Sequence, residues 1–408
     1  QGFEAMGKPR VLVLTTAYHH RHRFRLHSFL PHLLKYVELD VIDVPLLSYD
    51  KREDEPLLRF LSRVFREVIS SPIKLSSDNS VDIYTIRAHL PGDFGALAST
   101  PLLKCLLTKI KRKYHAVLAT PFLAGFLALI SRKHLSGAQI IYEDVDRFYD
   151  FFKNPSARLF AKAVEHTTIR SADAVIAASP HLYIEDVILR NGRNTYFVPN
   201  GVEYDRLRKA SERVKERERY SIVYVGAVEW WSGLDVAVKA LKLVTRELRN
   251  AKLYVIGEHR TRFGLYLQRL IKELDLSNNV VFLGRKPYDF VVNFLPRCRV
   301  GISTFPRSEV MVKAFPYKIL EYCASGTPVV MTDVTALSWF VKRYGAGYVH
   351  EVGDVEGLAA SIIELITDDE LWRERSKNAI KLASMFDIKV LAKLEARIIA
   401  SLGGYSLE

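Results

Sequence analysis

Short apolar runs alternate with stretches of helical spacing along most of the chain. The runs in the first half are VLVL at residues 11–14, LDVIDV, VDIYTI, HAVLAT, AQIIYEDVD, DAVIAAS and NTYFVPNG. A second series follows with SIVYVGAV, AKLYVIGE, NVVFLG, CRVGIST and TPVVMTD. Apolar runs that alternate with helical segments are typical of parallel strands covered by helices on both faces. The pattern therefore predicts two doubly wound α/β domains.

The stretch VPNGVEYDRL lies between the two series. Pro199, Asn200 and Gly201 interrupt regular structure, and the segment that follows has helical spacing, so we predict an interdomain hinge rather than a hairpin. The expected domains cover residues 6–200 and 201–385. A terminal helix over residues 386–408 is expected to close the second domain, with a return to the first domain as a further option.

The composition is that of an ordinary globular protein. The 408 residues are 49% hydrophobic and 26% charged, which suffices for two cores and excludes a disordered chain. No stretch reaches 18 apolar residues, so no transmembrane helix is expected. Three scattered cysteines and the lack of a secretory pattern favour a cytoplasmic protein, with peripheral binding to the inner face of the cell membrane as an extension.

The net charge is +13, and two basic tracts without acidic residues lie in the first half. Residues 5–37 and 101–142 contain no acid, and such tracts attract phosphates, acidic sugars or anionic lipid heads, unless they are simply a solvated surface. Segment 94–133 alternates apolar and basic residues, which suits an amphipathic helix on an anionic membrane or an ordinary helix covering the sheet. No groove-reading helix or aromatic RNA motif accompanies the charge, so nucleic acid is not an expected partner.

The stretch KAFPYKILEYCASGTPVV, residues 313–330, combines a predicted helix with a buried strand. Pro316 suits the first helical turn, and Lys318 and Glu321 share one face. A lysine at the positive end of a helix is unfavourable unless an anion binds there, held by free N–H groups and the ammonium together. Glu321 is placed to accept hydrogen bonds from two neighbouring hydroxyls, as in a ribose. These residues predict a nucleotide-diphosphate site, with a plain surface Lys–Glu pair as the alternative.

Several motifs in order resemble those of GT-B-fold, group 1 glycosyltransferases. PYKILEYCASGTPVV resembles their nucleotide-sugar helix, YFVPNGVEYDRL their interdomain segment, and RSADAVIAASP the strand before it. IVYVGAVEWWSGLDVAVKAL, LYVIGE and VVFLGRKPYDFVVNFLPRCRVGIST are similar to successive elements of their donor domain. The resemblance covers about residues 165–350. It implies the GT-B fold, in which two Rossmann-like domains face a central cleft, with the donor bound to the second domain and the acceptor to the first.

The resemblance also implies roles for matching residues. Glu321 would hold the ribose diol, while Tyr317 and Lys318 would meet the diphosphate. The other implied donor contacts are Gly226, Ala227 and Val228 at the phosphates, Gly284, Arg285, Lys286 and Tyr288 at the base, and Pro316 in the turn. Phe305 is expected to line the pocket, with core packing as the alternative.

Two features depart from the family pattern. Lys313 occupies the position where many members carry a glutamate that holds the donor sugar, and Glu309 lies four residues earlier. The first donor-domain loop, AVEWWSGLD, has no cation, so Lys313, Lys318 or Arg307 would supply the charge. A lysine that faces the sugar suits a carboxylated donor such as a uronic acid. These departures leave retention and inversion both open.

Ligands of open parallel sheets bind outside the carboxyl ends of the strands, which draws attention to IIYEDVD and YHHRHRFRLH. Asp146, with Asp144 as second choice, is the predicted base for the acceptor hydroxyl, and helix capping is the alternative. Arg21, Arg23 and Arg25 are predicted to bind a phosphate or acidic acceptor. No metal-ligand spacing is present, so neither a metal nor another cofactor is expected.

The combined prediction is a metal-independent hexosyltransferase. It would move a hexosyl or uronosyl group from a UDP- or GDP-sugar to a hydroxyl of a lipid-linked or anionic glycan acceptor, in polysaccharide or glycolipid biosynthesis. The alternatives are a nucleotide-sugar epimerase of the same fold and a non-enzymatic two-domain sugar-binding protein.

Overall fold

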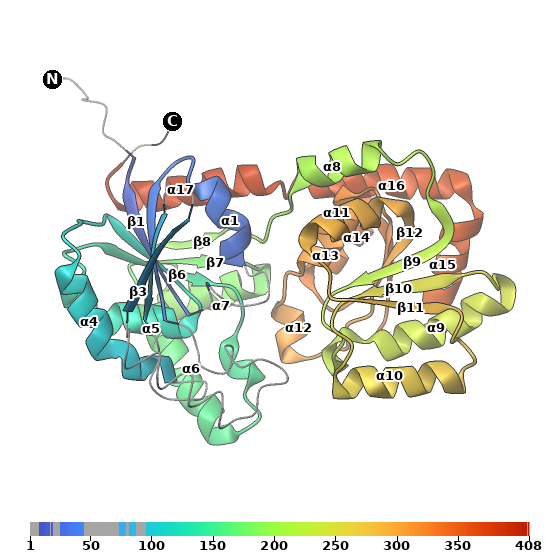
Figure 1. Cartoon of the computed structure of the whole chain (residues 1–408), viewed down its shortest axis with the longest axis horizontal. Helices are drawn as coiled ribbons and strands as arrows, with labels where there is room; N and C mark the ends of the chain where they lie inside the picture. The colour runs from blue at the N-terminus through green and yellow to red at the C-terminus, as the bar shows by residue number, and fades with distance from the viewer. Residues whose placement is uncertain are drawn as a thin grey trace. The chain divides into compact units, whose positions relative to one another are not determined.

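The chain passes from the first of two compact units to the second within the Pro-Asn-Gly stretch, between Pro199 and Asn200. The computed structural model describes residues 8–16, 18, 25–44, 73–78, 81–86, 95–405 and 407. Unit 1 comprises Gln1–Pro199 and Val390–Glu408, and unit 2 comprises Asn200–Lys389. Helix α17 (Ile388–Leu402) begins in unit 2 and continues in unit 1 (Figure 1).

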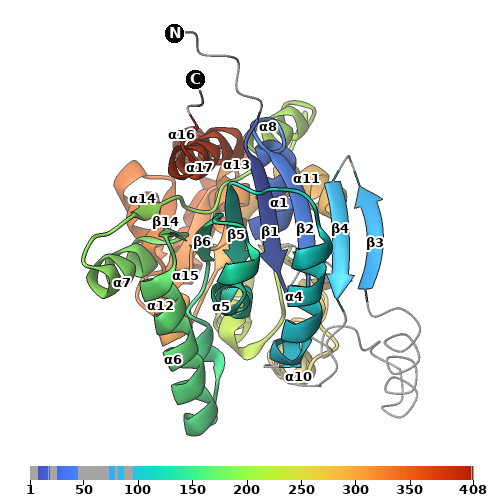
Figure 2. The same cartoon turned by 90° about the vertical axis from the view of Figure 1, so that its left-hand side faces the viewer.

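In the described part of unit 1, eight strands form one sheet in the order β3-β4-β2-β1-β5-β6-β7-β8. Their bounds are β1 Arg10–Thr15, β2 Glu38–Asp43, β3 Ile73–Asp78, β4 Val81–Ile86, β5 Ala116–Thr120, β6 Gln139–Asp144, β7 Ala174–Ala177 and β8 Thr195–Phe197. All neighbours are parallel except β3 and β4, which pair antiparallel at the edge of the sheet (Figure 2). The apolar pattern did not predict β3, because its sequence IKLSSD is largely polar. The strand lies at the edge of the sheet, where it is largely exposed.

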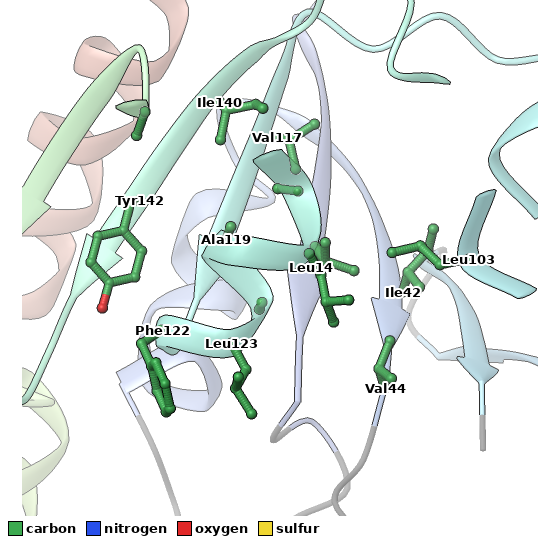
Figure 3. Packing of buried hydrophobic residues seen from close by; sticks show 14 of the residues in the cluster. Leu14, Ile42, Val44, Leu103, Val117, Ala119, Phe122, Leu123, Ile140 and Tyr142 are labelled. Atoms are coloured by element: carbon green, nitrogen blue, oxygen red, sulfur yellow. The ribbon is translucent and has the colours of Figure 1, made fainter. Parts of the chain in front are cut away.

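The helices of unit 1 share a core of buried apolar residues with its sheet. Their described bounds are α1 Arg25–Leu33, α4 Thr100–Lys109, α5 Phe122–Ile130, α6 Pro155–Ser171 and α7 Pro180–Arg190. Figure 3 shows Leu14, Val117 and Ile140 from three strands in the apolar cluster that also contains Phe122 of α5. A Cβ at Gly125 would lie 2.5 Å from Thr168 Cγ2, so glycine is required where α5 crosses α6.

Unit 2 contains a wholly parallel sheet in the order β11-β10-β9-β12-β13-β14. Its strands are β9 Glu218–Val225, β10 Lys252–Ile256, β11 Val280–Gly284, β12 Cys298–Ser303, β13 Val329–Thr332 and β14 Gly347–His350. Its helices are α8 Tyr204–Glu212, α9 Leu234–Glu247, α10 Arg262–Glu273, α11 Tyr288–Phe294, α12 Glu309–Lys313, α13 Tyr317–Ala324, α14 Ala336–Tyr344, α15 Val355–Thr367 and α16 Asp369–Ser384. Two doubly wound parallel sheets are thus confirmed.

The strands are apolar runs because both faces of each sheet are covered. All residues of β5, β12 and β13 are buried, as expected of central parallel strands. Among the described residues, no helix combines the length and apolar character that crossing a membrane requires.

Candidate functional site

The first turn of α13 and the end of β9 meet at the carboxyl edge of the unit 2 sheet. Lys318 donates a hydrogen bond from Nζ to Tyr224 Oη at 3.1 Å. Its ammonium lies 4.1 Å from the centre of the Tyr224 ring and 4.7 Å from that of Phe305. Tyr224 in turn donates to the carbonyl oxygen of Ala227 at 2.8 Å. Two aromatic rings and a hydroxyl therefore orient the lysine head group.

Gly226 lets this lysine approach the backbone. It follows the last residue of β9 and has a φ of +141°, a region that glycine favours. A Cβ at this position would lie 2.8 Å from Lys318 Nζ. The amide of Gly226 donates to the carbonyl oxygen of Ile256 at 3.0 Å, which fixes the turn. An ammonium against a glycine backbone is chemistry suited to a phosphate oxygen.

The electrostatics of the site favour an anionic ligand. Burial lowers the pKa of Lys318 to about 7, and the nearby Glu321 carboxylate opposes this shift. Glu321 follows one turn later and is half-buried. Since a dianion beside Nζ would stabilise the protonated amine, ligand binding and protonation of Lys318 are coupled.

Binding of a nucleoside diphosphate at pH 8 is expected to take up close to one proton. With a pKa of about 7 the free amine is mostly neutral at that pH, whereas a bound diphosphate favours the ammonium. Isothermal titration in two buffers of different ionisation enthalpy measures the uptake. Lys318→Met should lose it, while Lys252→Met, an exposed lysine at the opposite end of β10, should keep it. Equal heats in both buffers would contradict the coupling.

The start of α13 is tied to the Pro-Asn-Gly stretch. Tyr317 Oη donates to Asn200 Oδ1 at 2.9 Å, and Asn200 Nδ2 donates to the carbonyl oxygen of Phe315 at 2.7 Å. Pro316 is the N-cap residue, with extended backbone. The Tyr317 hydroxyl, predicted to meet the diphosphate, thus also positions the helix start. The sequence motif indicated only that Asn200 interrupts regular secondary structure.

Tyr322 connects α13 to β9 through a hydrogen bond. Its hydroxyl accepts a hydrogen bond from the amide of Val225 at 2.8 Å, one residue before Gly226. Its ring is fully buried against Gly301, where a Cβ would lie 2.5 Å from the Tyr322 ring. This contact fixes the helix that carries Lys318 and Glu321.

The residues predicted around the base lie at the same edge of the sheet. Gly284 ends β11 with a φ of +70°. Arg285 and Lys286 are exposed, and Lys286 Nζ lies 5.4 Å from the centre of the Phe290 ring. Tyr288 is half-buried beneath the guanidinium of Arg206, which lies 5.3 Å from its ring. The strand order separates this segment from Gly226 by one intervening strand, β10.

The residues that depart from the family pattern lie in α12 and in the loop after β9. Lys313 is buried at the end of α12, with its Nζ 4.0 Å from Glu309 Oε2, and the Glu309 side chain is exposed. In the first loop Val228 is buried, while Trp230 and Trp231 are exposed and pack edge to face at 5.6 Å. The loop thus presents aromatic surface and no cation.

Arg25 of unit 1 is fully buried, so its placement does not favour the predicted role in acceptor binding. Its guanidinium pairs with Glu143 on β6 and Glu395 on α17, and donates to the carbonyl oxygen of Pro199 at 2.8 Å. Arg21 and Arg23 lie outside the described residues, as do His19, His20 and His22.

The two candidate bases, Asp144 and Asp146, lie at and just after the end of β6 and differ in burial. Asp144 is fully buried and pairs with Arg147, which also binds Glu185 and Asp186. Burial raises the pKa of Asp144, and the Arg147 guanidinium opposes the shift. Asp146 is half-buried, and burial together with the charge of Asp144 raises its pKa to about 7. Asp146 is therefore the more accessible carboxylate and the one poised near neutrality.

Among the residues that the structure describes, no group of three or more His, Cys, Asp or Glu side chains has the geometry to hold a metal ion. The Lys318 amine at the start of α13 is a donor that suits an anionic oxygen ligand.

Comparisons with known proteins agree with this geometry. Residues 205–382 match the family Glycosyl transferases group 1. Putative teichuronic acid biosynthesis glycosyltransferase TuaH of Bacillus subtilis is 27% identical over 229 residues, 54% of this chain and 56% of that protein. N-acetyl-alpha-D-glucosaminyl L-malate synthase of Bacillus anthracis is 31% identical over 145 residues, 36% of this chain and 35% of that protein. The chain thus spans about half or less of the length of these curated relatives.

Solved structures are similar over nearly the whole chain. Sucrose-phosphate synthase from Thermosynechococcus elongatus has a TM-score of 0.72 at 16% identity, covering 97% of this chain and 99% of that one. Anabaena HepE in complex with UDP-glucose has a TM-score of 0.68 at 17% identity, covering 96% and 99%. At such identities the similarity establishes the fold, which is GT-B. The family match covers residues 205–382 and agrees with the family that the sequence motifs resemble.

Proposed function

We propose that the chain transfers a hexosyl or uronosyl group from a nucleoside-diphosphate sugar to a hydroxyl of a lipid-linked or anionic glycan, without a metal ion. The observation that carries the proposal is the Lys318 ammonium held against Gly226 at the end of β9. Solved neighbours contain UDP or UDP-glucose. A relative named for capsular polysaccharide biosynthesis and another for teichuronic acid biosynthesis support a polymeric acceptor.

In this proposal the donor's diphosphate lies between Lys318 and the backbone at Gly226. Departure of the nucleoside diphosphate leaves negative charge on its terminal phosphate, and a fixed cation with backbone amides stabilises that charge more in the transition state than before it. Glu321, one turn along α13, accepts hydrogen bonds from the ribose hydroxyls. The site therefore needs no divalent cation to neutralise the leaving group.

Lys313 extends the proposal to the sugar. Lys313 is buried, and its Nζ lies 4.0 Å from Oε2 of Glu309. The carboxylate of a uronosyl group is a ligand with which an ammonium forms a charge-assisted hydrogen bond. We therefore expect UDP-glucuronic acid to bind more tightly than UDP-glucose, and Lys313→Gln to remove most of that preference.

A thermal-shift screen of nucleotides and nucleotide sugars tests the donor assignment. At a hundredfold excess over its dissociation constant, the correct donor should raise the melting temperature by about 5 °C or more. The matching nucleoside without phosphates should leave the melt unchanged. Turnover of the identified donor only when a hydroxyl acceptor is present supports transfer, whereas turnover without acceptor indicates epimerisation or another donor-only reaction. A melt indifferent to every nucleoside-diphosphate sugar contradicts the proposal.

A further inference from the structure

The first turns of α6 and the segment before them carry an apolar surface far from the donor residues in sequence. Figure 1 and Figure 2 show α6 extending away from the sheet of unit 1. Phe151 ends the short helix before α6, and Leu159 and Phe160 lie in the first turns of α6. Residues 151–162 are called the α6 tip below.

Three large apolar side chains of the tip are exposed. The exposed fractions are 54% for Phe151, 71% for Leu159 and 49% for Phe160. Leu159 precedes the fully buried Ala161 by two residues, about 200° round the helix, so it points away from the core. The outer face of a solvated helix is normally polar. Exposed apolar residues gathered on one projection are the mark of a binding surface.

The tip is rigidly supported. The ring of Phe148 stacks at 5.2 Å on Phe122 of the core, and the Phe151 ring lies 6.0 Å from Phe148. Asn154 caps α6 by accepting a hydrogen bond from the amide of Ala157 at 3.1 Å. The exposed side chains are therefore held out by packed and capped structure, which limits the entropy that a binding partner must remove.

The charge around the tip has one sign. The exposed charged side chains between residues 151 and 172 are basic: Lys153, Arg158, Lys162 and Arg170. The acid within that range, Glu165, is fully buried. Asp150, which directly precedes this range, pairs with Arg158 at 2.7 Å, and the Asp150 side chain is 1% exposed. Apolar side chains surrounded by basic ones complement a surface with an apolar interior and anionic heads.

We propose that the α6 tip docks the protein on an anionic lipid surface, with Phe151, Leu159 and Phe160 inserted among the headgroups and Lys153 and Lys162 beside lipid phosphates. This docking goes beyond the proposed transfer reaction and does not depend on which donor is used. It also moves the predicted membrane contact from segment 94–133 to another helix.

Helix α4, within segment 94–133, lacks the exposed apolar face that insertion requires. Its Leu103, Leu106 and Leu107 are buried against unit 1. Just after it, Arg112 pairs with Asp40 and Asp82, each at 2.8 Å, which neutralises part of the basic tract. Helix α4 therefore packs on the core of unit 1, which favours the alternative interpretation of this segment, a helix that covers the sheet.

Vesicle sedimentation with the full chain tests the proposal. The wild-type protein should pellet with vesicles containing phosphatidylglycerol at low salt, pellet less at high salt, and stay in solution with pure phosphatidylcholine. Leu159→Ser with Phe160→Ser should lower the partition coefficient at least about tenfold, because inserted apolar area is lost. Lys153→Gln with Lys162→Gln should lower it about thirtyfold, since each basic group near an anionic surface contributes about fivefold.

A matched control comes from unit 2. Leu265 and Tyr266 on α10 are adjacent and are 58% and 41% exposed, so Leu265→Ser with Tyr266→Ser removes similar apolar area. This variant should bind vesicles like the wild type, and all variants should keep the wild-type melting temperature within a few degrees. The proposal is overturned if the wild type stays in the supernatant at low salt, if the α6 variants bind unchanged, or if the α10 variant alone is released.

Discussion

Replacing Glu321 by alanine should lower the affinity for the nucleotide sugar by at least about a hundredfold and leave the thermal melt of the free protein almost unchanged. Two hydrogen bonds from ribose hydroxyls to a carboxylate contribute about 1.5–3 kcal/mol each. Glu321 lies on the half-buried face of α13, whereas Ile319, Leu320, Tyr322 and Cys323 make up its buried face. The substitution therefore removes ligand contacts and little core packing.

Calorimetric titration with the donor found in the thermal-shift screen measures the loss. Glu273→Ala, which removes an exposed carboxylate from α10, should bind the donor normally. If Glu321→Ala binds donor as tightly as the wild type, the ribose assignment is wrong. A melt that falls by ten degrees or more would instead assign Glu321 to the support of the fold.

The α/β organisation was predictable because it depends on local pattern. Buried runs such as HAVLAT and CRVGIST are mostly apolar, as expected of strands covered on both faces, and each contains a strand. The helix from Tyr317 to Ala324 was likewise marked by Pro316 before it and by its spaced apolar residues. Such signals are complete within about ten residues and need no knowledge of distant partners.

The partners of the functional residues were not predictable in the same way. Lys318 binds Tyr224 across 94 positions, and Arg25 reaches Glu395 across 370. No periodicity within one element encodes such pairs. The sequence marked Lys318 as an unusual lysine but did not reveal its aromatic support. It assigned Arg25 to acceptor binding because the segment follows the first strand, at the edge where ligands of parallel sheets bind.

The sequence also did not reveal the side-chain hydrogen bonds that position the elements of the site. Asn200 was interpreted as part of an interdomain hinge, since Pro-Asn-Gly interrupts regular structure, yet its side chain joins Tyr317 to Phe315. Tyr322 fits the apolar spacing of α13, yet its hydroxyl accepts a hydrogen bond from the amide of Val225. Both cases show a polar group whose local role is visible in sequence, while its second role arises only from tertiary structure.

Asp146→Asn should reduce turnover by about 10²–10⁴-fold without weakening donor binding, if Asp146 removes the proton of the acceptor hydroxyl. The asparagine keeps the size of the side chain and loses the basic oxygen. Because burial and the Asp144 charge raise the pKa of Asp146 to about 7, the wild-type rate should fall as the pH drops through that value and the base becomes protonated. The rate–pH profile with saturating donor measures this directly.

Asp144→Asn provides the contrast that separates chemistry from folding. Asp144 is fully buried against Arg147, so its substitution leaves a buried guanidinium with one partner fewer and should lower the melting temperature clearly. Asp146 is half-buried and forms no such pair with another residue that the structure describes, so Asp146→Asn should melt like the wild type. Full activity of Asp146→Asn, or loss of activity that follows a loss of stability, would remove Asp146 as the base. Proton transfer to the leaving phosphate, with retention at the sugar carbon, would then account for the reaction.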